Sequence, residues 1–203
     1  MGEGERGGLG VIDICQDSAR EQLEFVAARF PVSMEAQYLR LGKWLTKDPL
    51  AKCDLDFIAH ELKNIHAYRP GDCYMNAWKI ATNRDVFTFC EGYAAGLWPV
   101  PHAWVTYKGR AIDVTWPTRW ERGHVGPARS IATIMQRVEH NLKSCSYLGV
   151  EVPTAVIRDH ALEQKTYSPL FDGQFHRRWP EFEKAIATGK FPCYNKSSKH
   201  TER

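Results

Sequence analysis

Residues 69–81 run Arg-Pro-Gly-Asp-Cys-Tyr-Met-Asn-Ala-Trp-Lys-Ile-Ala, in which a turn signature is followed by a short apolar pattern. The first four residues are typical of a turn. The apolar residues that follow recur at helical spacing, which predicts a helix over 73–81 that buries Ala77 and Trp78. The pattern therefore places Cys73 in the first turn of a helix.

Three strand-like segments follow this helix. They cover residues 86–93, 103–107 and 111–115. Lys108, Gly109 and Arg110 separate the last two segments, and Lys-Gly between two β-rich runs predicts a tight hairpin. We therefore expect a small antiparallel sheet directly after the cysteine-bearing helix.

The rest of the chain has mostly helical patterns. The further expected elements are helices at 18–30, 34–45, 54–68, 127–142 and 180–187 and an extended segment at 147–153. Asp54 is the candidate N-cap of the third of these helices. Proline residues 31 and 49 follow the first two helical patterns and are expected to end them.

These patterns predict one α+β domain over residues 1–203, because neither an internal repeat nor a low-complexity linker interrupts them. Its expected parts are a flexible leader at 1–10, a helical flank at 11–68, a core at 69–117 that holds the helix and strands just described, a C-terminal helical part at 118–191 and a flexible tail at 192–203. A chain of this length can bury enough surface to be stable without a disulfide or a structural metal.

The composition argues against several classes of protein. The formal net charge of +3 is too small, and the Lys and Arg residues too dispersed, for a nucleic-acid-binding surface. No apolar run approaches the roughly 18 residues of a membrane span. The six cysteines form no CxxC pair and no zinc-spaced cluster. With no signal-peptide pattern at the start, we expect a cytoplasmic protein with reduced thiols, no metal and no organic cofactor.

Three residues of the predicted core have the side chains and positions of a nucleophilic site. The N-terminus of a helix favours an ionised thiol, here Cys73. His102 follows a Pro-Val-Pro run at the beginning of a strand, and Asp113 lies on the other strand of the predicted hairpin. A carboxylate there can orient the imidazole. The hypothesis is that Cys73 is the nucleophile, His102 the base and Asp113 the residue that orients the base.

The same part of the chain resembles a known family. Its motifs, in order, are Gly-Asp-Cys73, Phe-Cys-Glu-Gly-Tyr93-Ala, His102-Ala-Trp and Ile-Asp113-Val-Thr-Trp116. This series over residues 69–117 resembles the core of the transglutaminase-like branch of the papain-like cysteine enzymes. One departure is Val114, which stands where that family usually has proline.

The resemblance implies a papain-like or transglutaminase-like core, with the cysteine-bearing helix packed on a small antiparallel sheet. It implies acyl transfer through a thioester, ending on water, as in a protease, amidase or deamidase, or on an amine, as in a transglutaminase. The implied substrate is a protein or peptide. Short phage and bacterial proteins have similar cores.

Other interpretations of the same residues remain open. Cys73 is also explained as a small buried hydrophobe, His102 as a surface histidine and Asp113 as a strand-edge carboxylate. For the whole chain, the alternative is a non-catalytic binding or inhibitor protein that uses the same fold. The retained cysteine and histidine speak against that alternative.

Four further residues are placed near the site by the same motifs. Tyr93, Trp104 and Trp116 are candidates for the substrate cleft. Packing in the core and cleft wall is the preferred explanation for the two tryptophans, and packing in the core explains Tyr93 equally well. Asn76, one turn after the cysteine, is expected to form a local cap or bridge. The pattern does not define the second donor to an oxyanion, nor the oligomeric state.

Overall fold

The computed structural model describes residues 14–65, 71–116, 130–164, 167, 169–171 and 179–188. Within these residues the protein is an α+β fold of seven helices and one five-stranded sheet. The helices are α1 (Ile14–Arg29), α2 (Met34–Leu41), α3 (Lys52–Leu62), α4 (Cys73–Asn83), α5 (Ile131–Ser144), α6 (Thr154–Gln164) and α7 (Trp179–Thr188). The strands are β1 (Lys43–Trp44), β2 (Thr88–Ala95), β3 (Pro99–Tyr107), β4 (Arg110–Ile112) and β5 (Ser146–Val152).

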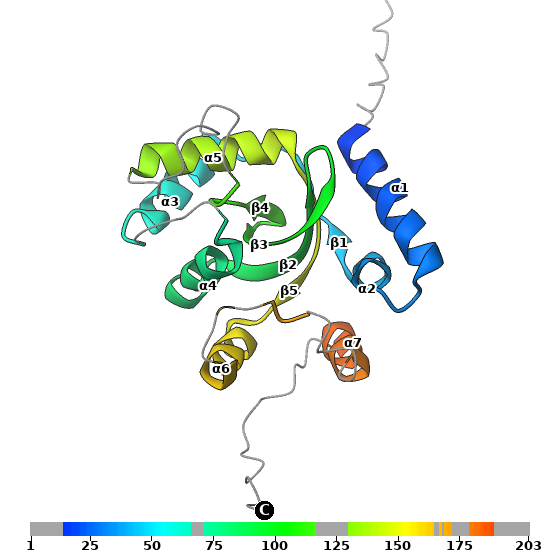
Figure 1. The fold of residues 1–203 in the computed structure, drawn as a ribbon. Helices are drawn as coiled ribbons and strands as arrows, with labels where there is room; N and C mark the ends of the chain where they lie inside the picture. Colours follow the sequence, from blue (N-terminus) through cyan, green and yellow to red (C-terminus); the bar gives the residue numbers. More distant parts are fainter. Residues whose placement is uncertain are drawn as a thin grey trace, which may run out of the picture.

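The five strands form one antiparallel sheet in the order β1-β5-β2-β3-β4. Figure 1 shows this sheet curling through the centre of the molecule, with helices arranged around it. The cysteine-bearing helix α4 contacts both β3 and β2, and α5 contacts β4. The predicted arrangement of a helix that begins at Cys73 and packs on a small antiparallel sheet is therefore confirmed.

The hairpin between β3 and β4 sets the spacing of the core motifs. Lys108 and Gly109 both have positive φ, 49° and 73°, as a type I′ turn requires. The turn pairs Tyr107 with Arg110, so the strands continue without a bulge. The predicted hairpin is thus confirmed, and its register brings the chain after β4 back beside the first half of β3.

The fourth strand is shorter than the sequence pattern predicts. It ends at Ile112, whereas the predicted strand continues to residue 115. The reason is local, because the Asp113 carboxylate accepts the backbone N–H groups of Thr115, at 2.8 Å, and Trp116, at 3.3 Å. These bonds replace ladder bonds and turn the chain away from β3.

Several predicted helices have different bounds. The first begins at Ile14 instead of residue 18. The second ends at Leu41, because Gly42 is extended and caps the helix through its N–H bond to Tyr38, and the next residues form β1 instead. The third begins at Lys52, so Asp54 is not its N-cap. It ends at Leu62, and the last part of the predicted range, 66–68, lies outside the described residues.

The C-terminal half contains one unexpected helix. The extended segment at 147–153 is confirmed as β5, which inserts between β1 and β2, and the predicted helices near 130–142 and 180–187 correspond to α5 and α7. Helix α6, which follows Pro153, was not expected, because its apolar residues do not form a clear stripe. The predicted leader at 1–10, the helix start at 127–129 and the tail at 192–203 lie outside the described residues.

Two glycines allow strands β2 and β5 to pack closely. Gly92 pairs with Gly149 on one side and with His102 on the other. A Cβ atom at Gly92 would lie 2.0 Å from the carbonyl oxygen of Leu148, and one at Gly149 would lie 2.6 Å from the indole ring of Trp104. The close packing in this part of the sheet therefore requires glycine at both positions.

We predict that Gly92→Ala lowers the free energy of unfolding by at least about 2 kcal/mol, because the new methyl group meets backbone that cannot move without opening the sheet. The control is Gly96→Ala, where a Cβ meets no atom within 4 Å; its effect should stay within about 0.5 kcal/mol. Urea unfolding of the two variants measures this difference. Equal stability of the two variants would contradict the packing argument.

Candidate active site

The thiol of Cys73 lies at the N-terminal end of α4. Gly71, with a φ of +84°, turns the chain into the helix, and Asp72 is the N-cap residue. The Asp72 side chain forms no capping hydrogen bond, although its carbonyl accepts the N–H of Asn76 at 2.9 Å. The first turn of α4, which begins at the half-buried Cys73, thus has no side-chain cap from Asp72.

The side chains of His102 and Asp113 form a buried pair. Nε2 of His102 lies 2.8 Å from Oδ2 of Asp113, and the two residues are 6% and 1% exposed. Because Nε2 is engaged by the carboxylate, Nδ1 is the ring nitrogen left for a second partner. The predicted association of this imidazole with the Asp113 carboxylate is present in the structure, although Asp113 lies just after β4 and not on the strand as predicted.

The surroundings of His102 favour its charged form. Burial by itself lowers the pKa of the imidazole, but the charge and hydrogen bond of Asp113 raise it, and a hydrogen bond and charge interaction with the Cys73 side chain add to the rise. The resulting pKa is about 10, against an ordinary 6.5. The structure thus brings Cys73, His102 and Asp113 together in one connected chain of side chains.

The carboxylate of Asp113 is held on both oxygens. Oδ1 accepts the two backbone N–H groups that turn the chain after β4. Oδ2 accepts the Tyr147 hydroxyl at 2.9 Å as well as the His102 ring. Burial alone would raise the pKa of this carboxyl, but the charge and hydrogen bond of His102, the Thr115 N–H and the Tyr147 hydroxyl hold it below its ordinary value.

Helix α5 supports the loop that carries Asp113. The Asn141 amide donates to the carbonyl oxygens of Asp113, at 3.1 Å, and Trp116, at 3.2 Å. One turn earlier on the same face, Arg137 donates to the carbonyl oxygen of Val114 at 3.0 Å. All three bonds are accepted by backbone carbonyl oxygens, so they hold the backbone of residues 113–116 independently of the side chains at these positions.

Asn76 joins the two halves of the site. Its buried amide donates to Thr115 Oγ1 at 2.9 Å, across 39 residues of sequence. The expectation was a local cap or bridge, whereas this bond is long-range. It ties the first turn of α4, and with it Cys73, to the loop that carries Asp113.

The three candidate cleft residues have different positions. Trp104 is 1% exposed and stacks on His102 with the ring centroids 6.2 Å apart, so it supports the imidazole from within the core. Trp116 is half-buried and meets the same imidazole edge-on at 5.3 Å. Tyr93 is not brought to the site, because its hydroxyl donates to Glu35 at 2.8 Å and its ring packs on Tyr38.

Sequence reasoning did not find Tyr147, Arg137 or Asn141 as parts of the site. The signal for the two α5 residues was available, since they are polar residues four apart beside an apolar stripe at Ile134 and Val138. No comparable signal existed for Tyr147. Its contact with Asp113 depends on β5 lying next to β2, which the order of elements along the chain does not indicate.

Chemically, the arrangement allows a thiol to transfer its proton to an imidazole whose other nitrogen is held by a buried carboxylate. Among the described residues, no group of three or more His, Cys, Asp or Glu side chains is placed to hold a metal ion. None of the helices in this part of the chain combines the length and the apolar character that crossing a membrane requires.

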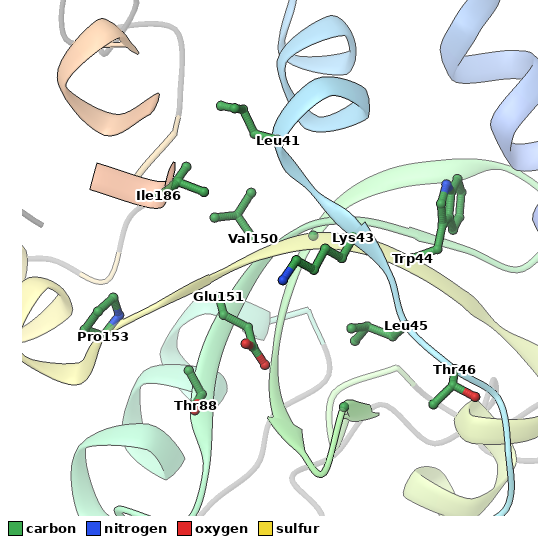
Figure 2. Close-up of a pocket in the computed structure, with 12 residues that line it drawn as sticks. Leu41, Lys43, Trp44, Leu45, Thr46, Thr88, Val150, Glu151, Pro153 and Ile186 are labelled. Carbon is green, nitrogen blue, oxygen red and sulfur yellow. The ribbon is translucent and has the colours of Figure 1, made fainter. Parts of the chain in front are cut away.

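A groove of about 780 Å³ lies elsewhere, along β5 and the segment that contains β1. Figure 2 shows Lys43, Glu151 and Val150 at this groove. Cys73, His102 and Asp113 are not among its lining residues. The presence of a groove therefore does not by itself locate the candidate site. We place this site where the thiol, imidazole and carboxylate converge.

Comparisons of this chain with protein-family models, with curated proteins and with solved structures found no match. The case for a function therefore depends on the geometry of the site itself.

We predict that stability depends on pH through His102. Its folded pKa of about 10 exceeds the unfolded value near 6.5, so its contribution to stability is complete below about pH 6.5 and is lost as the pH rises through 10. Asp113, with a lowered pKa, contributes above about pH 4 and loses its contribution as the pH falls below that.

Urea unfolding of the wild type and of His102→Gln, from pH 5 to pH 10, measures this dependence. The difference in free energy of unfolding should be largest near pH 5 to 6.5 and should shrink steadily toward pH 10. His140→Gln, which changes an exposed histidine on α5, controls for the loss of a histidine as such. Parallel stability curves for the wild type and His102→Gln would contradict a raised pKa.

Proposed function

We propose that this protein is a cysteine-dependent acyl-transfer enzyme, in which Cys73 is the nucleophile, His102 the acid and base and Asp113 the residue that orients His102. The observation that carries the proposal is the connected series of side chains: a thiol at a helix N-terminus, an imidazole that interacts with it, and a buried carboxylate 2.8 Å from the far ring nitrogen. A structural cysteine needs none of these partners.

The proposed reaction has two steps. The Cys73 proton resides on Nδ1 of His102, and the thiolate attacks the substrate carbonyl carbon, forming a C–S bond while the π electrons move to oxygen. The oxyanion then collapses, the C–N bond of the amide breaks, and His102 returns the proton to the leaving nitrogen. Water or an amine attacks the thioester as His102 takes its proton, and the C–S bond breaks to restore the thiolate.

The N-terminus of α4 supports the same step. The developing oxyanion requires preorganised N–H donors, and first-turn amides without a side-chain cap can supply them. The backbone N–H of Cys73 is the candidate donor, because it belongs to the same residue as the attacking sulfur. The dipole of the helix adds partial positive charge at this end, which favours both the thiolate and the oxyanion.

The proposal includes a papain-like or transglutaminase-like core. Supporting it are the chain order of Cys73, His102 and Asp113 and their positions at a helix start, on a strand and after the next strand. The packing of α4 on β3 supports it as well. On this basis the proposed substrate is an amide of a protein or peptide, either a glutamine side chain or a main-chain bond.

The first experiment is the pH dependence of iodoacetamide alkylation at each cysteine, followed by peptide mass spectrometry. In the wild type, Cys73 should react quickly below pH 7, and faster there than the exposed thiol of Cys53. In His102→Gln, the fast reaction of Cys73 below pH 7 should be lost. Asp113→Asn should slow it at least about tenfold, because the imidazole loses its orienting partner.

Incubation with a nitrophenyl acyl ester then tests group transfer. An acyl enzyme on Cys73 should form with a burst of one nitrophenol per chain, and the acyl group should appear on the peptide that contains this residue. Cys73→Ser should remove the burst without lowering the melting temperature. If Cys73 of the wild type reacts no faster at low pH than Cys53, the acyl-transfer proposal fails and the non-catalytic binding alternative takes its place.

A further inference from the structure

A third strand takes part in the geometry of the candidate site. Tyr147, on β5, donates its hydroxyl to Oδ2 of Asp113 at 2.9 Å, the same oxygen that His102 Nε2 contacts at 2.8 Å. The other oxygen, Oδ1, is already held by backbone N–H groups. The hydroxyl and the imidazole therefore meet at one atom.

The tyrosine is itself held in place. It pairs with Ala94 in the centre of the sheet, and its ring lies against Trp104 with the centroids 4.9 Å apart. Its backbone carbonyl accepts the N–H of Leu45 at 2.9 Å. The residue is 3% exposed, so its hydroxyl has little access to water as an alternative partner.

The surroundings of Tyr147 favour the protonated form of its phenol, which is the form that donates a hydrogen bond. Burial raises the pKa of the phenol well above its ordinary value of 10, and the negative charge of Asp113 raises it further. A phenol whose pKa is raised in this way is a neutral O–H group at neutral pH. Its hydroxyl can therefore donate the hydrogen bond to Asp113 as a neutral group.

We infer that Tyr147 is a positioning residue, which acts on the proposed reaction by fixing Oδ2 of Asp113 where it holds Nε2 of His102. The inference rests on the proposed function. Without the hydroxyl, the carboxylate loses one of its donors, and the imidazole loses part of the constraint that turns Nδ1 toward Cys73. The effect on the thiol is indirect, because Tyr147 touches neither the thiol nor the substrate.

The sheet offers a matched control in Tyr93. It is 5% exposed, and its hydroxyl also donates to a carboxylate, Oε1 of Glu35, at 2.8 Å. It lies on β2 opposite Leu148, so alternation along the strands directs it to the other face of the sheet from Tyr147. Tyr93→Phe thus removes the same kind of hydrogen bond without touching Asp113.

The experiment compares Tyr147→Phe and Tyr93→Phe in the pH profile of Cys73 alkylation. Tyr147→Phe should slow the reaction at pH 7 about tenfold and move the acid limb of the profile to higher pH, because a less well-oriented imidazolium stabilises the thiolate less. Tyr93→Phe should keep the wild-type profile, even where its melting temperature falls. A structural role alone would lower stability in both variants and change neither profile.

A second comparison tests whether the effect passes through the carboxylate. In an Asp113→Asn background, adding Tyr147→Phe should change the alkylation rate by less than about twofold. A further tenfold loss there would overturn the inference. If Tyr147→Phe does not fold, 3-fluorotyrosine at position 147 keeps the ring and the hydroxyl but is a stronger donor. This substitution should change the pH at which the acid limb of the Cys73 alkylation profile lies, whereas 3-fluorotyrosine at position 93 should leave it unchanged.

The two proposals fail in different ways. If the wild type shows no fast alkylation of Cys73 at low pH, the proposed function fails, and the role of Tyr147 in it fails with it. If the wild type and His102→Gln behave as proposed but Tyr147→Phe matches the wild type, the enzyme proposal stands. Only the positioning role is then overturned.

Discussion

The buried pair of His102 and Asp113 sets requirements that the elements around it must meet. Both side chains are almost fully buried, and at neutral pH the imidazole is charged. Removing two charges from water costs several kcal/mol for each ion, which is recovered only if the geometry is good and the remaining donors and acceptors are satisfied. The surrounding elements meet that requirement, since Asp113 receives hydrogen bonds on both carboxylate oxygens.

The supports of this pair come from separate parts of the chain. Strand β3 carries the imidazole, α5 holds the loop of the carboxylate through Arg137 and Asn141, and β5 supplies the Tyr147 hydroxyl. The indole of Trp104 stacks on His102 and lies where a side chain at Gly149 would otherwise be. Supports of this kind are what the proposed function requires, because small displacements of reacting groups are costly.

The core motifs were the most predictable part of the protein. The turn before Cys73, the helix after it and the hairpin at Lys108-Gly109 depend on neighbouring residues, so their patterns can be interpreted without the rest of the chain. The helix of residues 154–164 and the end of β4 at Ile112 were not predicted. The first lacks an apolar stripe, and the second depends on hydrogen bonds of the Asp113 side chain that compete with the ladder.

Of the candidate site, the sequence by itself indicated Cys73, His102 and Asp113 and the hairpin that brings the last two close together, since the turn depends only on neighbouring residues. The register of the strands was left open, and the structure places Asp113 just after β4 instead of on the strand. Only the tertiary structure decided which residues support these three side chains. Tyr147 reaches Asp113 because β5 inserts between β1 and β2, and Asn76 reaches Thr115 because α4 packs beside the loop after β4. Tyr93 was assigned to the cleft from its motif, but the alternation of side chains across the sheet directs it toward Glu35. Contacts between residues tens of positions apart depend on how the sheet and helices assemble, and this assembly cannot be predicted from local sequence patterns.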